Sequence, residues 1–251
     1  MLKAYKYRIY PTEEQKEFFA KTFGCCRFIY NKMLNDKIEY YKETGKMLKN
    51  TPAQYKAEFT FLKEVDSLAL ANAQIDLETA YKNFFRDKLI GFPEFKSKRN
   101  KQSFKTNNQN GTVAIVDDKL KIPKLKSLIK IKLHRNFTGI IKSATISKTP
   151  TGKYFVSILV DTENIRLPEN NNKIGIDLGI KDFAITSNGD KYENPKWLRK
   201  SEKRLRKLQK DMSRKQKGSN NRNKARLKVA KLHEKITNQR KDFLHKLSSK
   251  L

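Results

Sequence analysis

The hydrophobic pattern changes its period once along the chain, near residues 91–93, and this change constrains the fold most. Before it, apolar residues recur at steps of three and four over 19–33 and again over 67–85. Such steps place side chains on one helix face, so they predict helices. After it, residues 101–161 alternate apolar and polar positions in short runs, separated by turn signals such as the Pro-Thr-Gly at 150–152, which predicts strands. Helices and strands segregated in this way indicate an α+β fold.

The first residues belong with the later strands. Residues 2–10, LKAYKYRIY, alternate and predict a strand, after which Thr12 and Gln15 stand at the spacing of a capping box and begin a helix expected to reach about Gly45. A further helix is expected from Thr51. Several short strands at this spacing suggest a small barrel, with the first strand in the same sheet and the helices inserted between.

Charge sets the chain apart from an ordinary globular protein. Lys and Arg number 56 against 26 Asp and Glu, a net charge of +30. Such self-repulsion does not help folding, so it indicates a polyanionic partner. Nucleic acid is favoured over an anionic membrane because no amphipathic stretch has a broad, uninterrupted apolar face. No membrane partner is therefore expected.

Targeting and cysteine signals point to the cytoplasm. The N-terminus carries charges where a signal peptide needs an apolar run, and no apolar run approaches the roughly 18 residues of a membrane span. Cys25 and Cys26 are adjacent, and no C-x-x-C occurs. The sequence therefore predicts a cytoplasmic protein without a disulfide framework and without a zinc site built from this chain alone.

The last part of the chain predicts a basic helical hairpin. Residues 196–251 contain 21 Lys and Arg but 4 Asp and Glu. An apolar stripe over 225–247 faces a shorter stripe over 205–212, and a Gly-Ser-Asn-Asn segment at 218–221 separates them. Solvated helix faces usually mix charge signs, whereas phosphate contact rewards uniform positive charge. The candidate nucleic-acid-binding patch comprises Lys203, Arg204, Arg206, Lys207, Arg214, Lys215, Lys217, Arg222 and Arg226.

Asp177 is a lone carboxylate in an apolar stretch, KIGIDLGIKDFAITSNGD at 173–190, which follows a polar linker at 164–172. Three interpretations compete. In the first, the Asp caps a local turn. In the second, it belongs to the phosphate loop of an actin-like ATPase, but that family usually has Thr or Ser at the position of Ile180, which speaks against this interpretation. In the third, it is the first metal ligand of a ribonuclease H-like nuclease. Mg²⁺ prefers such oxygen ligands, and the net charge favours the third interpretation.

Several stretches, taken together and in order, carry a family resemblance. They are YKYRIYPTEEQ, GCCRFIYNKML, LETAYKNFF, GFPEFKSKRN, LKIPKL, GIDLGIKDFAITSNG and the basic tail, and they span nearly all of the 251 residues. In these stretches the chain resembles the TnpB family, the OrfB-type transposases encoded by insertion sequences and relatives of type V CRISPR effectors. The resemblance implies an RNA-guided DNA endonuclease that depends on Mg²⁺.

The resemblance also implies a domain layout and partners. It implies a wedge-type β-barrel from 1–10 and 96–163, a helical recognition lobe at 11–95, and the N-terminal part of a RuvC nuclease domain with the basic hairpin at 173–251. A guide RNA from the transposon end and a target DNA are the implied partners. Asp177 falls on the first RuvC carboxylate, so it is the implied catalytic residue and metal ligand. Ser67, Asn72 and Thr106 fall where the family contacts a short DNA motif.

The sequence lacks the motifs that follow the basic hairpin in the family, and this changes the function that we expect. In the family a later Glu, a four-Cys zinc motif and a final Asp follow the basic hairpin, and this sequence ends at Leu251. We therefore expect a chain truncated relative to the family, with an incomplete Mg²⁺ site, an open sheet edge and no cleavage activity of its own. The alternatives are a non-catalytic repressor or scaffold, and one half of a split nuclease completed by a downstream chain.

Overall fold

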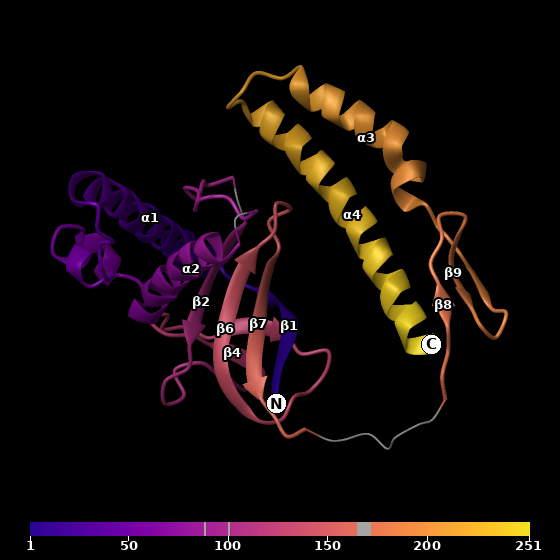
Figure 1. The fold of residues 1–251 in the computed structure, drawn as a ribbon, viewed down its shortest axis with the longest axis horizontal. Coiled ribbons are helices and arrows are strands. Elements are labelled where there is room, and N and C mark those ends of the chain that lie inside the picture. The colour runs from indigo at the N-terminus through magenta and orange to yellow at the C-terminus, as the bar shows by residue number, and fades with distance from the viewer. Residues whose placement is uncertain (88, 100, 165–171) are drawn as a thin grey trace. The chain divides into compact units, whose positions relative to one another are not determined.

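The computed structural model describes all residues except 88, 100 and 165–171, and it divides into two compact units (Figure 1). Unit 1 spans Met1–Asn164 and unit 2 spans Ile165–Leu251. Most of the expected linker at 164–172 lies outside the described residues. The α+β prediction is confirmed. None of the described helices combines the length and the apolar character that a membrane span requires.

The described strands of unit 1 form a seven-stranded antiparallel sheet in the order β2-β6-β7-β1-β5-β4-β3. The N-terminal strand β1 lies in its middle, between β7 and β5, which confirms that residues 2–10 share a sheet with the later strands. The strands are β1 (Leu2–Tyr10), β2 (Gln102–Asn107), β3 (Ala114–Val116), β4 (Lys119–Lys121), β5 (Ile129–Lys132), β6 (Ile140–Lys148) and β7 (Tyr154–Asp161).

The sheet is curled and open rather than the closed barrel that the strand spacing suggested. Within the described residues, β2 and β3 are the two edges of a linear strand order and do not pair with each other. The strands β3 and β4 have three residues each, with β3 pairing only with β4 and β4 continuing to β5. One end of the sheet therefore consists of a short hairpin that does not meet the other edge.

Helix α1 (Glu13–Thr44) starts and stops where the sequence indicates. Thr12 Oγ1 accepts a hydrogen bond from the Gln15 amide at 3.3 Å, and Gln15 Oε1 accepts one from the Thr12 amide at 3.1 Å. This is the predicted capping box. Gly45 ends the helix with φ 67°, a left-handed conformation that glycine adopts without a steric penalty. The Gln15 amide nitrogen Nε2 also donates to Ser127 Oγ at 3.0 Å, which ties the helix start to the segment before β5.

The helix expected from Thr51 is wrong. The structure has two short 3₁₀ turns there, η1 (Gln54–Lys56) and η2 (Thr60–Lys63), before helix α2 (Ser67–Arg86). Hydrogen bonds tie this segment to α1. The Tyr55 hydroxyl donates to Asp36 Oδ2 of α1 at 2.8 Å and accepts a hydrogen bond from Asn50 Nδ2 at 2.8 Å. Burial raises the pKa of Tyr55 to about 12, so this hydroxyl stays protonated and remains a donor.

The core of unit 1 lies between the inner face of the sheet and helices α1 and α2. Phe19 of α1 is fully buried, and its ring centroid lies 6.1 Å from that of Phe104 on β2 and 5.7 Å from that of Tyr154 on β7. From α2, the fully buried Leu77 joins the same apolar cluster. Full burial of a side chain of this size contributes about 1.5–3 kcal/mol, so these contacts hold the helices on the sheet.

Unit 2 combines a small sheet with the predicted hairpin. Its described strands run in the order β10-β9-β8, with β8 (Ile176–Asp177), β9 (Asp182–Thr186) and β10 (Lys191–Glu193). Helices α3 (Trp197–Ser213) and α4 (Asn220–Lys250) pack through Leu205, Val229, Leu232 and Ile236, as the two stripes predicted. The ring of Phe243 on α4 contacts those of Phe183 on β9 and Trp197 on α3, at 5.1 and 5.4 Å between centroids.

Candidate nucleic-acid interface and catalytic carboxylate

Asp177 lies on an exposed edge strand and not in a buried one, contrary to the apolar pattern around it. Within the described strands β8 pairs with β9 alone, and Asp177 stands opposite Ile185. The flanking side chains of Ile176 and Leu178 are 45% and 70% exposed. An apolar run is buried only where a second layer or a further strand covers it. Among the described residues, nothing covers the side chains of Ile176 and Leu178.

The described residues do not by themselves fit the metal centre that the resemblance implies. Asp182 and Glu193 stand opposite each other on β9 and β10, whereas Asp177 lies on β8 and faces Ile185. In the part of the chain that the structure describes, no three His, Cys, Asp or Glu side chains converge on a point. A two-metal centre for phosphodiester cleavage needs several carboxylates around shared ions. Asp177 is therefore an isolated candidate ligand.

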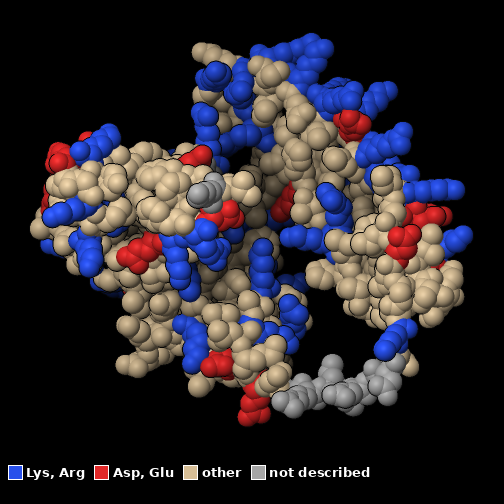
Figure 2. All heavy atoms as spheres, viewed as in Figure 1, with Lys and Arg blue, Asp and Glu red and all other residues tan. Residues whose placement is uncertain are grey.

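The basic patch lies on the exposed sides of the hairpin, where Lys and Arg gather over α3 and the start of α4 (Figure 2). Leu205, Leu208 and Met212 of α3 pack in the inner seam against α4, whereas the Lys and Arg residues of the patch on α3 are exposed. Arg206 forms an ion pair with Glu202 at 2.6 Å. Lys203, Arg204 and Lys207 are exposed, and among the described residues they make no ion pair. These three cations are therefore available to an external anion.

The turn of the hairpin holds the rest of the patch. A cavity of about 380 Å³ opens there, lined by Leu208, Asp211, Arg214, Lys215, Ala225 and Lys228. Three of these six side chains are cationic and one is acidic. Lys217 and Arg226 are exposed close by in sequence. The hairpin tip thus adds a hollow with net positive charge to the cationic faces of the helices.

Arg222 has a structural role that its place in a basic run concealed. Its Nη1 donates to the backbone carbonyls of Lys215 at 2.8 Å, Met212 at 3.1 Å and Ser213 at 3.5 Å. Met212 and Ser213 are the last residues of α3 and Lys215 follows the helix, so the guanidinium lies at the helix end where the dipole favours a cation. The backbone amide of Arg222 is itself capped by Ser219 Oγ at 3.1 Å. Arg222 therefore closes the turn between α3 and α4, and the other patch residues do not share this role.

The three residues expected at the DNA motif lie around the contact between α2 and β2. Thr106 Oγ1 donates to Asp66 Oδ2 at 2.5 Å, and Asp66 also caps α2 by accepting from the Ala69 amide at 3.2 Å. Asn72 Nδ2 donates to the Leu68 carbonyl at 2.7 Å. Thr106 and Asn72 are only 1% and 6% exposed. Their side chains are thus engaged within the protein, whereas Ser67 is exposed and accepts a hydrogen bond from Lys56 Nζ at 2.7 Å.

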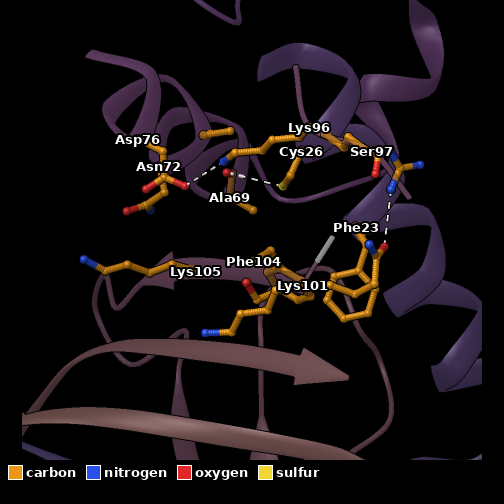
Figure 3. A pocket seen from close by; sticks show the side chains of 14 residues that line it. Phe23, Cys26, Ala69, Asn72, Asp76, Lys96, Ser97, Lys101, Phe104 and Lys105 are labelled. Atoms are coloured by element: carbon orange, nitrogen blue, oxygen red, sulfur yellow. Dashed lines mark hydrogen bonds and ion pairs between the residues drawn. The ribbon is translucent and has the colours of Figure 1, made fainter. Parts of the chain in front are cut away.

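Beside Asn72 the structure opens a pocket that the sequence did not indicate (Figure 3). It measures about 270 Å³ between α1, α2 and the segment leading into β2. Lys96 crosses it, with its Nζ 3.2 Å from Asp76 Oδ2 and 3.9 Å from the centroid of the Tyr30 ring. Burial raises the pKa of Cys26 to about 12, so the thiol in its wall is protonated and a poor nucleophile. Cys26 is therefore not a candidate nucleophile in this pocket.

Two family models match parts of the chain. Residues 157–251 match OrfB_IS605, described as "Probable transposase", and residues 1–46 match HTH_OrfB_IS605, described as "Helix-turn-helix domain". The first match contains the whole of the small sheet and the basic hairpin. The second contains β1 and α1, and in the structure α1 is one continuous helix over Glu13–Thr44.

Relatives and a solved structure agree with these models. A protein of Streptomyces pristinaespiralis, named as an RNA-guided DNA endonuclease, is 38% identical over 99% of this chain and 64% of its own length. InsQ of Escherichia coli, named likewise, is 31% identical over 99% of this chain and 63% of its own length. The chain therefore spans a little under two thirds of each relative. A Cas12f1 chain solved with sgRNA and target DNA shares the fold, with a TM-score of 0.54 at 16% identity over 95% of this chain and 62% of that one. The chain belongs to the TnpB family of transposon-associated, OrfB-type proteins, as do these two relatives.

Proposed function

We propose that residues 1–251 form the nucleic-acid-binding part of an RNA-guided DNA endonuclease and hold a guide RNA from the transposon end against a target DNA. The observation that carries this proposal is the hairpin of α3 and α4, whose apolar residues meet in the seam while cations cover its exposed sides, most of them without an ion pair among the described residues. Phosphate neutralisation is the interaction that favours such uniform charge. The names of the relatives support RNA and DNA as the two ligands.

The parts of the fold take the family's roles in this proposal. The seven-stranded sheet acts as the wedge, the helical segment at 11–95 as the recognition lobe, and the sheet and hairpin at 173–251 as the first part of a RuvC domain. Ser67 is the exposed member of the group near the DNA motif. Asp177 contributes one ligand to a Mg²⁺ centre, whose further carboxylates do not gather around it among the described residues.

Binding is expected to weaken steeply with salt. If six to ten phosphates are contacted, the logarithm of the association constant falls with the logarithm of salt concentration at a slope of about −5 to −9. The measurement is a salt titration of the 251-residue chain against a labelled structured RNA and a labelled DNA duplex. A slope near zero for both ligands would contradict the proposed function, because it would mean that few counterions leave on binding.

The 251-residue polypeptide is expected to leave DNA intact. We propose this because Asp177 stands alone on β8 and in-line cleavage needs a group of carboxylates. The assay combines the chain with RNA transcribed from its own transposon end, Mg²⁺, and a plasmid library randomised beside the target, so that any flanking motif is represented. The Streptomyces relative with its own RNA is the positive control. Cleavage that disappears on Asp177→Ala would show that this chain assembles the centre by itself.

The exposed β8 edge favours a second candidate, one half of a split nuclease. Ile176 and Leu178 present apolar side chains on a strand edge that, among the described residues, has no further strand beside it, which is the condition for adding a strand. A separate polypeptide that pairs there would bring further carboxylates towards Asp177. An adjacent reading frame that encodes acidic strands and C-x-x-C pairs would support this candidate over a repressor or scaffold, and purified product of that frame should restore cleavage in the assay above.

A further inference from the structure

The sheet of unit 1 has a second face that the fold does not use. Neighbouring residues of a strand point to opposite sides, and in β1 the side chains of Tyr5, Tyr7 and Ile9 lie in the core at 8%, 0% and 1% exposure. The alternate residues point the other way, and Tyr10 among them is 47% exposed. The aromatic residues of this first strand therefore divide into two buried core rings and one open ring.

The strand register shows what surrounds Tyr10. Arg8 stands opposite Phe155 of β7 on one side and Lys132 of β5 on the other. Tyr10 stands opposite Lys130, which in turn stands opposite Lys119 of β4. We call this set the outer face, and its central members are Lys6, Arg8, Tyr10, Lys119, Lys130, Lys132, Thr145, Ser147, Phe155 and Ser157.

The outer face is cationic and hydroxyl-rich, and Asp161 on the same side of β7 is already paired with cations. None of its ten members is acidic. Asp161 shares the strand face of Phe155 but lies at the far end of β7, where Lys142 Nζ and the Met1 nitrogen each approach its carboxylate to 3.3 Å. A polyanion that lies across β1 and β5 therefore meets positive charge without an unpaired carboxylate among the described positions.

Cations of this face lie over its aromatic rings. The Arg8 guanidinium carbon lies 5.4 Å from the centroid of the Tyr10 ring and 5.2 Å from that of the Phe155 ring. Lys6 Nζ lies 4.9 Å from the Phe155 centroid. Arg8 Nε is buried and, among the described residues, has no hydrogen-bond partner. An unpaired buried donor is costly and rare in folded proteins, so the fold itself does not account for the position of this guanidinium beside the exposed Tyr10 ring.

We propose that the outer face binds a single-stranded segment of nucleic acid, with a base stacked on Tyr10 and the adjoining phosphates against Arg8, Lys130 and Lys132. Stacking on an exposed aromatic ring requires an unpaired base, because the faces of paired bases are covered by their neighbours in a duplex. The lysines on the neighbouring strands then contact the phosphates of the nucleotides next to the stacked base. This inference rests on the proposed function. It adds which surface of the protein binds nucleic acid and that the bound nucleic acid is single-stranded there.

The test uses Tyr10→Ala in the complete 251-residue chain. We expect its affinity for a labelled uridine oligonucleotide of about 20 residues to fall about 5- to 160-fold, which is the range for loss of one stacked base. Its affinity for an RNA duplex of the same length should stay unchanged, and so should the salt slope for both ligands. The matched control is Tyr41→Ala on α1, an exposed tyrosine (55%) outside the outer face, which should bind both ligands like the parent.

A second variant separates charge from stacking. Replacing Lys130 and Lys132 by alanine should reduce the magnitude of the single-strand salt slope by about one to two, because phosphate contacts are lost while the ring remains. Equal losses on single strand and duplex in Tyr10→Ala, or an unchanged single-strand affinity, would overturn the inference and leave the proposed function standing. A parent chain that binds neither RNA at low salt would instead overturn the proposed function.

Discussion

Replacing Lys203, Lys207 and Lys210 of α3 by glutamine is expected to lower the affinity for DNA duplex about 100-fold near physiological salt and to reduce the magnitude of the salt slope by about two to three. The three side chains are exposed, and within the described residues they form no ion pair. Each can therefore replace a counterion on a phosphate, and the losses should multiply. The measurement is a salt titration of parent and variant with one labelled duplex.

A matched variant decides whether the hairpin or the total charge matters. Lys16, Lys21 and Lys42 of α1 each form an ion pair, at 2.6, 3.3 and 3.1 Å from a Glu oxygen. Changing all three to glutamine alters the net charge by the same amount, but it removes cations whose charge is already balanced locally. This variant should keep most of the affinity. Equal losses in the two variants would show that binding follows the net charge of +30 and not the hairpin.

Phe19→Ala is expected to destabilise unit 1 by about 3–5 kcal/mol, which is a large fraction of the 5–15 kcal/mol that stabilises a typical domain. Its ring is fully buried and bridges α1 to Phe104 and Tyr154, at the two strands β2 and β7. Removing it leaves a cavity at the point where helix and sheet meet. The measurement is urea denaturation followed by far-UV circular dichroism, which should show a lower midpoint for unit 1.

The control for this cavity is Phe95→Ala, which deletes the same atoms from a ring that is 53% exposed. Surface changes of this kind usually stay within about 0.5 kcal/mol. Because the chain has two compact units, two transitions are expected and the variants should be compared on the same one. A midpoint that shifts equally for Phe19→Ala and Phe95→Ala would mean that Phe19 does not join helix to sheet as the structure shows.

Elements whose residues interact locally could be predicted from the sequence. The capping box at Thr12, the long helix to Gly45 and the facing stripes of the hairpin all depend on spacings of three or four residues, which the sequence displays directly. The segment after Thr51 could not be predicted, because its path follows hydrogen bonds to Asp36 on another element. Strand β2 lies within the stretch predicted to form strands, but its own signal is weak: QSFKTN is polar apart from Phe104, and its edge position beside α2 supports its conformation.

The candidate site was predictable as residue types but not as geometry. Asp177 stands out in the sequence, yet its exposure depends on which strands pair with β8 and not on its neighbours in the chain. The proximity of Asp66 and Thr106 arises from packing between elements 40 residues apart. Arg222 looks like any cation of a basic run, and only the position of the α3 carbonyls reveals that it closes the turn.

The uncovered strand β8 bears on how this polypeptide behaves when it is produced alone. Ile176 in β8 is 45% exposed, and the flanking Ile174, Leu178 and Ile180 are 39%, 70% and 87% exposed. An apolar segment of this kind at an uncovered strand edge favours strand exchange between molecules. Lys173 and Lys181 bracket the segment and oppose that self-association through charge repulsion. High salt, which screens the two lysines, should therefore promote aggregation while it releases bound nucleic acid, and the two effects need separate readouts in any purification.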